Sequence, residues 1–165
     1  MIQNKTKALL ILLLFSCNVH VWALEGDRNK PIEIEADQGS LDQKNQTTVF
    51  TGNVKMSQGS MYMNAGRITA HKDNAGNQTM VATGNLAKFG QQLEKDGMVT
   101  GQGNQINYDS LSGIVTVTGN AQVNRAGDMV QGTKIIYNTR TEVYTVHSDS
   151  KNRVHVLIQP QTKNK

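Results

Sequence analysis

The sequence predicts a nearly all-β protein built from repeated units of short antiparallel strands. The tripeptide Thr-Gly-Asn occurs three times, with its glycines at positions 52, 84 and 119. The steps of 32 and 35 residues are typical of stacked supersecondary units. The chain has only two prolines and is rich in threonine, valine, asparagine and glutamine, which favours strands and turns. No stretch after Ala23 has a clear apolar pattern at helical spacing.

The residues around the tripeptide favour strands on both of its sides. Thr48–Phe50 and Ile114–Val117 precede it with β-branched and aromatic residues. Val54–Met56 and Ala121–Val123 follow it with alternating apolar and polar residues. Each copy is therefore predicted to mark a Gly-Asn turn or bulge between two strand segments.

A second motif lies between the tripeptides. It reads Met63-x-Ala65-x-x-Ile68 in one unit and recurs around Ile106 and Ile135, with a weaker copy at residues 34–41. The middle unit carries about six extra residues, in the segment 90–97. Turns between the units are expected at residues 43–45, 72–77, 110–113 and 138–140, where Asn, Asp, Ser and Gly gather.

Alternation along these strands predicts one apolar face and one polar face. The structure expected is a stack of antiparallel strands rolled round one continuous apolar interior. Frequent methionines suit a surface that accepts irregular apolar ligands, although they also fill gaps in ordinary cores. The apolar face is expected to carry Ile34, Phe50, Val54, Met56, Met63, Ile68, Met80, Ala82, Leu86, Ile106, Tyr108, Val115, Val117, Ala121, Val123, Ile135 and Tyr137, and the opposite face Lys55, Asn64, Arg67, Asn107, Gln122 and Lys134.

The first 23 residues are predicted to be a cleaved secretory signal peptide. Lys5 and Lys7 precede an apolar run at residues 8–15, and small residues flank the expected cleavage site after Ala23. The run is shorter than the roughly 20 residues that span a bilayer. Residues 24–158 are then one domain, and residues 159–165 a flexible tail. Acylation of Cys17 in a lipoprotein-like box is the alternative; without Cys17 no disulfide can form.

Charge and motifs argue against nucleic-acid binding and catalysis. From Leu24 to Ser150 there are 11 lysines and arginines against 13 acidic residues, which leaves no basic footprint for nucleic acid. The sequence has no nucleophile elbow, P-loop or Cys-x-x-Cys motif. His71, His147 and His155 have no partner at metal-ligand spacing. We expect a protein that is not an enzyme and has no metal or cofactor.

Five segments, in this order and spacing, resemble the OstA-like family of periplasmic lipopolysaccharide-transport proteins. The resemblance covers roughly Gly26 to Val156. It is carried by Pro31–Gln38, Phe50–Val54, Leu86–Phe89, Thr118–Ala121 and Gly132–Tyr137.

The resemblance implies an open, twisted β-jellyroll whose apolar trough binds the lipid A acyl chains of lipopolysaccharide. Such proteins would stack head to tail and form a bridge from the inner to the outer membrane, with an inner-membrane-anchored partner and an outer-membrane partner. The implied trough residues are Ile32, Ile34, Phe50, Val54, Met63, Ile68, Phe89, Ile106, Tyr108, Val117, Ile135 and Tyr137. The implied docking edges carry Ile32, Ile34, Ala36, Val143, Val146, Val154 and Val156.

Two other classes of function fit the same alternation. A secreted adaptor could associate through its edge strands around an ordinary closed core, because a lined trough and a filled core have the same sequence pattern. A carbohydrate-binding β-solenoid would need clustered surface carboxylates or an exposed aromatic row, and the sequence suggests neither.

Overall fold

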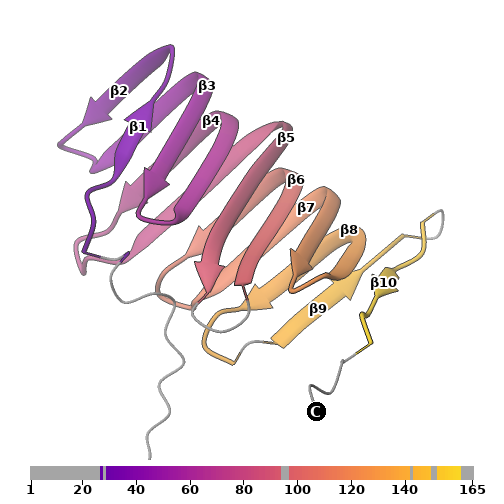
Figure 1. Cartoon of the computed structure of the whole chain (residues 1–165). Coiled ribbons are helices and arrows are strands. Elements are labelled where there is room, and N and C mark those ends of the chain that lie inside the picture. Colours follow the sequence, from indigo (N-terminus) through magenta and orange to yellow (C-terminus); the bar gives the residue numbers. More distant parts are fainter. Residues whose placement is uncertain (1–26, 28, 94–96, 142, 150–151, 161–165) are drawn as a thin grey trace, which may run out of the picture.

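The computed structural model describes residues 27, 29–93, 97–141, 143–149 and 152–160. Its ten strands form one antiparallel sheet in the order β1-β3-β4-β5-β6-β7-β8-β10, in which β2 also pairs with β3 and β9 with β8 (Figure 1). The predicted all-β class is confirmed. The strands are β1 (Glu33–Glu35), β2 (Gln38–Asp42), β3 (Thr47–Gln58), β4 (Met61–Lys72), β5 (Gln78–Leu93), β6 (Gly97–Asp109), β7 (Ile114–Arg125), β8 (Asp128–Asn138), β9 (Val143–His147) and β10 (His155–Leu157).

The predicted leader and most of the predicted tail lie outside the described residues. Residues 1–26 and 161–165 belong to this part of the chain. Across the described residues, no helix has the length and apolar character needed to cross a membrane.

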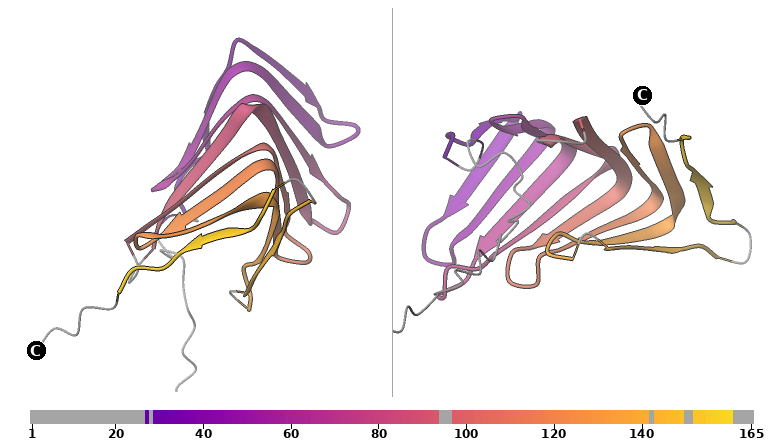
Figure 2. Two further views of the ribbon diagram at one scale, coloured as in Figure 1. Left: turned by 90° about the vertical axis from the view of Figure 1, so that its right-hand side faces the viewer. Right: turned by 60° about the horizontal axis from the view of Figure 1, so that its bottom comes forward.

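Each long strand bends near its middle, and the bends lie side by side, so that the sheet is folded into a V (Figure 2). At the bend the pairing register is interrupted, for example between Thr51 and Val54 of β3 and between Thr118 and Ala121 of β7. A β-bulge turns a strand without ending it. The predicted Gly-Asn corner is thus a bulge within a continuous strand.

The first and third copies of the tripeptide share a left-handed backbone. Gly52 and Asn53 have φ angles of 81° and 45°, and Gly119 and Asn120 have φ angles of 73° and 50°. Glycine adopts this region at little cost and asparagine tolerates it. The side-chain amide of Asn120 also donates a 3.0 Å hydrogen bond to Oδ1 of Asn104 on the neighbouring strand. These bulges therefore need the Gly-Asn pair that the sequence repeats.

The Gly119→Ala variant is expected to lose about 2–4 kcal/mol of unfolding free energy. A Cβ at this position would lie 2.7 Å from Oδ1 of Asn104. That oxygen cannot retreat without weakening its hydrogen bond from Asn120. Chemical denaturation followed by circular dichroism would measure the loss.

Gly97→Ala is the matched control. Gly97 has a φ angle of 69°, but an added Cβ would meet no other atom within 4 Å. This variant carries the left-handed strain alone, about 1–2 kcal/mol. Equal losses in the two variants would contradict a steric role for Asn104.

The bend divides the sheet into two arms. Arm A consists of β2, β9 and the strand segments 47–51, 67–72, 78–83, 105–109, 114–118 and 134–138. Arm B consists of β1, β10 and the segments 54–58, 61–64, 87–93, 97–102, 121–125 and 128–132.

Hairpin turns capped by aspartate end arm A, as the sequence predicts. Hydrogen bonds from the backbone and side chain of Asn45 lower the pKa of Asp42. Those from the side chain and backbone of Asn77 lower the pKa of Asp73. The pKa of Asp109 is lowered chiefly by the Leu111 N–H, which donates to its carboxylate at 2.8 Å. These carboxylates are therefore ionised at neutral pH and close the turns.

The middle copy of the tripeptide bends its strand differently, and the prediction for Leu86 is wrong. Pairing between β5 and β6 jumps from Thr83 to Ala87, so Leu86 lies inside the bend. The bend reverses the alternation, because Ala82 and Ala87 are both fully buried although they are five residues apart, a spacing that a regular strand would place on opposite faces. Ala87, which is fully buried, occupies the interior in place of Leu86. The peptide bond between Asn85 and Leu86 is cis.

Candidate functional site

The inner faces of the two arms line a long apolar trough. On arm A one continuous row of paired residues runs from Phe50 on β3 through Ile68 and Ile106 to Ile135 on β8. On arm B the corresponding row runs from Ile34 on β1 to Val156 on β10. The arm B row crosses the sheet from edge to edge, and the arm A row crosses the six long strands. The trough therefore has the full length of the sheet.

Burial falls from the bend towards the open lips of the V. Eight residues next to the bend are only 0–2% exposed. Met56, Met63 and Val123, one row further out, are 5–7% exposed. A closed core would bury its outer rows as well, because both walls would meet there. The residues next to the bend are Val54, Ile68, Ala82, Ala87, Ile106, Val117, Ala121 and Ile135.

The other apolar side chains of the inner faces, at the ends of these rows and nearer the lips, are only partly buried. No polar or charged side chain is buried among the described residues, so the innermost rows offer apolar contacts. Two half-exposed apolar walls that face each other can cover an apolar ligand at low cost, because their side chains have no hydrogen bonds with water to give up. The partly buried residues that pack against the core are Ile34, Phe50, Met61, Ala65, Met80, Phe89, Val99, Val115, Val130, Tyr144 and Val146.

Two glycines on β6 leave room for the larger side chains of neighbouring strands within the trough. A Cβ on Gly101 would lie 2.2 Å from the ring of Phe89, which crosses it. A Cβ on Gly103 would lie 2.5 Å from Cγ1 of Val117. Because both glycines are buried on the inner face, they set the depth of the trough at its centre.

Two aromatic rings meet near the end of the trough formed by β8 and β9. Tyr137 and Tyr144 are cross-strand partners on arm A. Their ring centroids are 4.3 Å apart and their planes lie at 19°, a stacked arrangement. Tyr144 also packs against the core. The stack gives this end of arm A a rigid apolar wall.

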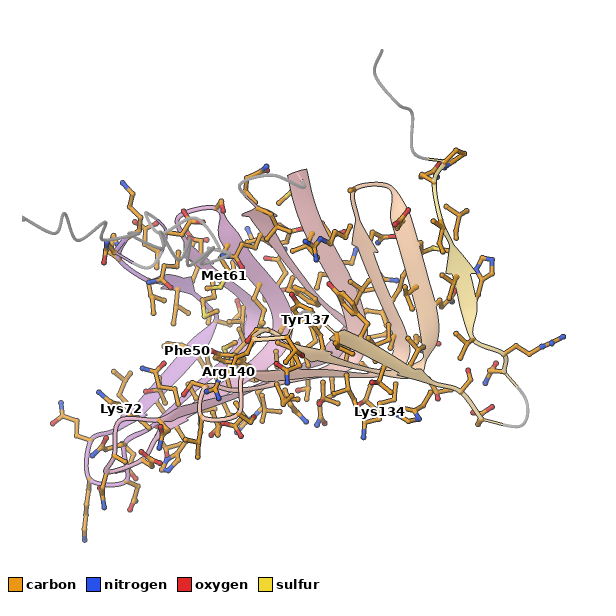
Figure 3. All side chains as sticks on the ribbon, turned by 90° about the horizontal axis from the view of Figure 1, so that it is seen from below. Phe50, Met61, Lys72, Lys134, Tyr137 and Arg140 are labelled. Atoms are coloured by element: carbon orange, nitrogen blue, oxygen red, sulfur yellow. The ribbon has the colours of Figure 1, made fainter. Side chains whose placement is uncertain are left out.

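The outer face of the sheet is polar. Lys55, Asn64, Arg67 and Lys134 are exposed, as the sequence predicts. Asn107 and Gln122 are partly exposed on the same face. Figure 3 shows Lys134 pointing away from the space between the arms, whereas Phe50 and Tyr137 lie on the inner face of the sheet. The two faces thus differ in chemistry, and only the inner one suits a lipid.

The structure brings eleven of the twelve predicted trough residues onto the two inner walls. Ile32 differs, because it precedes β1 and is 56% exposed at the end of the sheet. The others are Ile34, Phe50, Val54, Met63, Ile68, Phe89, Ile106, Tyr108, Val117, Ile135 and Tyr137.

Several residues that shape the trough were not among the sequence-predicted site residues. Ala87, Gly101 and Gly103 carry little or no side chain, so no hydrophobic pattern points to them. Tyr144 lies in a degenerate end unit without the Gly-Asn marker. The strand-pairing register would have identified all four residues. The sequence does not reveal this register, because the bulges differ in length from strand to strand.

The predicted docking residues lie at the two ends of the sheet. Ile34 is in β1, which pairs only with β3, and Ala36 follows it. Val143 and Val146 are in β9 and Val156 is in β10, and both strands pair only with β8. Val154, like most of these residues, is exposed. Each end of the sheet therefore consists of two short strands, one on each arm, whose outer edges are open for pairing.

The described residues hold no group of three or more histidine, cysteine, aspartate or glutamate side chains that could bind a metal ion.

A family model described as "LptA/(LptD N-terminal domain) LPS transport protein" matches residues 33–143, which is most of the sheet. The chain belongs to this family. The family consists of transport proteins, so the expectation that the chain is not an enzyme is confirmed.

Curated relatives in the LptA family share close to a third of their residues with the chain. The lipopolysaccharide export system protein LptA of Escherichia coli K12 is 31% identical over 161 residues, covering 95% of this chain and 87% of the relative. LptA of Haemophilus influenzae is 31% identical over 163 residues, covering 97% and 94%. LptH of Pseudomonas aeruginosa is 29% identical over 150 residues, covering 86% of each.

A solved structure in the LptA family has the same fold. The crystal structure of LptH from Pseudomonas aeruginosa is described as the LptA-homologous periplasmic component of the conserved lipopolysaccharide transport device. It superposes with a TM-score of 0.71 at 27% identity, covering 82% of this chain and 99% of LptH. The predicted open, jellyroll-like fold of antiparallel strands is confirmed by this match.

Proposed function

We propose that the chain transports lipopolysaccharide across the periplasm and holds the acyl chains of its lipid A in the trough between arms A and B. The apolar, half-exposed inner walls are the observation that supports this function most directly. Membership of the LptA family and the export-system names of its curated relatives support the same substrate.

The energetic need for such a trough follows from the lipid. Moving an acyl chain through water costs about 0.8 kcal/mol per exposed CH2 group, or roughly 10 kcal/mol for a chain of about twelve. Walls that replace water along the whole path remove most of this cost. Because the apolar rows run from β3 to β8 on arm A and from β1 to β10 on arm B, a lipid could slide along them without crossing a polar barrier. The trough needs no reaction of its own.

The same proposal includes location and partners. A cleaved leader would export the chain to the periplasm, where the solved LptH is a component of its transport device. Residues 24–158 would act there as one domain. Open edges at both ends would join copies of the chain head to tail, and would join inner-membrane-anchored and outer-membrane proteins of the same system.

Photo-crosslinking is the experiment that tests the trough. A photoreactive phenylalanine analogue in place of Phe50, Phe89 or Tyr137 should capture lipopolysaccharide, because these half-buried side chains face the space between the arms. The exchange of one aromatic side chain for another disturbs the walls little. Captured lipid is measured as a mass shift that reacts with an antibody against lipopolysaccharide.

The matched controls are Lys55, Lys88 and Lys134 on the outer face. Lys88 is the direct neighbour of Phe89 in β5 and is exposed. The same analogue at these positions should capture at least about tenfold less lipid, since outer side chains meet water. Equal capture at positions 88 and 89 would refute the proposed trough.

A further inference from the structure

In the described strands, charged residues on the inner face of the sheet lie at its lips. Side chains two residues apart in a strand share a face, so the pairing registers show which residues point inwards. Three charged residues of these strands continue the inner alternation, namely Lys72 at the end of β4, Arg125 at the end of β7 and Asp128 at the start of β8. The apolar interior is therefore bordered by charge where the arms meet water.

Arg125 and Asp128 flank the tight turn between β7 and β8. They are direct cross-strand partners, and only Ala126 and Gly127 separate them. Both turn residues have positive φ angles, 51° and 90°, as two-residue hairpin turns prefer. The Cβ atoms of such partners lie about 4.5–5.5 Å apart on one face. The hairpin therefore places a cationic and an anionic side chain next to each other on the inner lip of arm B.

A pocket of about 310 Å³ lies at this lip. Apolar side chains and the charged pair line it together. Its size is at the lower end of the roughly 300–1,000 Å³ that is typical of small-ligand sites. Tyr144 comes from arm A, so a ligand in the pocket contacts both walls of the trough. The lining residues are Val123, Arg125, Ala126, Asp128, Val130 and Tyr144.

The order of these side chains matches an amphipathic lipid. Val123, one row deeper than Arg125, is 5% exposed and belongs to the core, whereas the charged pair is half-buried and nearer to water. An acyl chain needs the deep apolar rows, while a phosphorylated sugar needs a cation and contact with water. A guanidinium binds phosphate oxygens through two parallel hydrogen bonds, which the ammonium group of Lys72 cannot do. Arg125 is therefore the side chain best suited to an anionic head group.

Asp128 weakens any anion contact at this lip. Its Oδ1 accepts a 2.8 Å hydrogen bond from the backbone N–H of Gln159, which fixes the carboxylate on the hairpin. The carboxylate repels a phosphate and attracts the guanidinium beside it, so it lowers the affinity for an anionic head group. A carrier must release its lipid as well as bind it, and a balanced pair of charges suits both steps.

We propose that Arg125 contacts a phosphate of the sugar head group of the lipid at the inner lip of arm B, while the acyl chains lie deeper in the trough. The pocket beside Arg125 then holds a phosphorylated sugar. Arg125 is a specificity-determining residue, because it makes the trough prefer a phosphorylated lipid to a neutral one with the same acyl chains. This inference rests on the proposed function and names the part of the lipid that this lip recognises.

Paired lipids and paired variants test the contact. Surface plasmon resonance would compare the binding of lipid A that carries both phosphates with that of chemically dephosphorylated lipid A. Arg125→Gln should lower the affinity for the phosphorylated lipid about tenfold and leave that for the dephosphorylated lipid within about twofold. Arg125→Lys should recover part of the loss, because it restores the charge without the planar fork. Inorganic phosphate at the concentration of the lipid should not compete, because it has no acyl chains to bind the trough.

A second variant is expected to change the affinity in the opposite direction. Asp128→Asn should bind the phosphorylated lipid about threefold more tightly, because a like charge is removed. The side-chain oxygen of asparagine can still accept the hydrogen bond from Gln159, so the hairpin keeps its contact. Lys134→Gln is the matched control. It removes one positive charge from an exposed position on the outer face and should change neither affinity beyond about twofold.

The outcomes separate the head-group contact from the trough. Equal affinity of the unaltered chain for both lipids, or equal losses for both lipids in Arg125→Gln, would overturn the phosphate contact and leave the trough intact. An equal loss in Lys134→Gln would replace the site by a general effect of net charge. Competition by inorganic phosphate would mean a site for free anions, which also overturns the inference. A chain that binds neither lipid would overturn the proposed function itself.

Discussion

The Tyr108→Asp variant is expected to lose lipopolysaccharide binding by about 30-fold or more. Tyr108 lies on an inner row of arm A between Met80 and Val115 and is only half-buried, so the sheet can accept the change. A carboxylate there must lose water when acyl chains fill the trough, which costs about 2–3 kcal/mol or more. Binding to immobilised protein, followed by surface plasmon resonance, would measure the change.

The neighbouring outer position supplies the control. Asn107→Asp adds the same charge one residue away, but Asn107 faces outwards and its Oδ1 accepts a 3.0 Å hydrogen bond from Gln105 that a carboxylate also accepts. Its affinity for lipopolysaccharide should stay within about twofold of the wild-type value. Similar losses in both variants would mean that net charge, and not the inner wall, controls binding.

Deletion of residues 154–165 is expected to abolish head-to-tail self-association. It removes β10, whose three residues pair with β8 and are all exposed. The loss takes away one docking strand on arm B together with the apolar side chains of Val154 and Val156. The melting temperature should change little, because these residues are not part of the buried core. Multi-angle light scattering would report the mass distribution.

A shorter deletion separates the strand from the tail. Removal of residues 161–165 alone leaves β10 in place and should leave the mass distribution unchanged. Multimers that persist after the longer deletion would show that β9 alone carries the joint.

The repeated tripeptide allowed much of the trough to be predicted from the sequence. Thr-Gly-Asn at residues 51–53 and 118–120 marks real bulges, because only glycine and asparagine adopt the left-handed backbone there cheaply. Simple alternation on either side of these bulges was enough to place Phe50, Val54 and Val117 on the inner face.

The middle repeat shows where such reasoning fails. The Gly84 copy has the same letters as the others, but neither Gly84 nor Asn85 has a positive φ angle, and its bend spans three residues. Local sequence did not reveal this, because the length of a bulge depends on how the neighbouring strand pairs. Leu86 was therefore misplaced, and the buried Ala87 was not seen.

By itself, the sequence determined the class of fold, the bend positions in the first and third repeats and the apolar character of one face, since these depend on backbone preferences and on a period of two. Only the tertiary structure decided that the two apolar walls stand apart as an open V. It also decided which residues share a row across the sheet, such as Ile34 and Val156. The reason is physical: alternation states which way a side chain points, but the distance between facing walls and the register of distant strands depend on contacts between residues far apart in the chain.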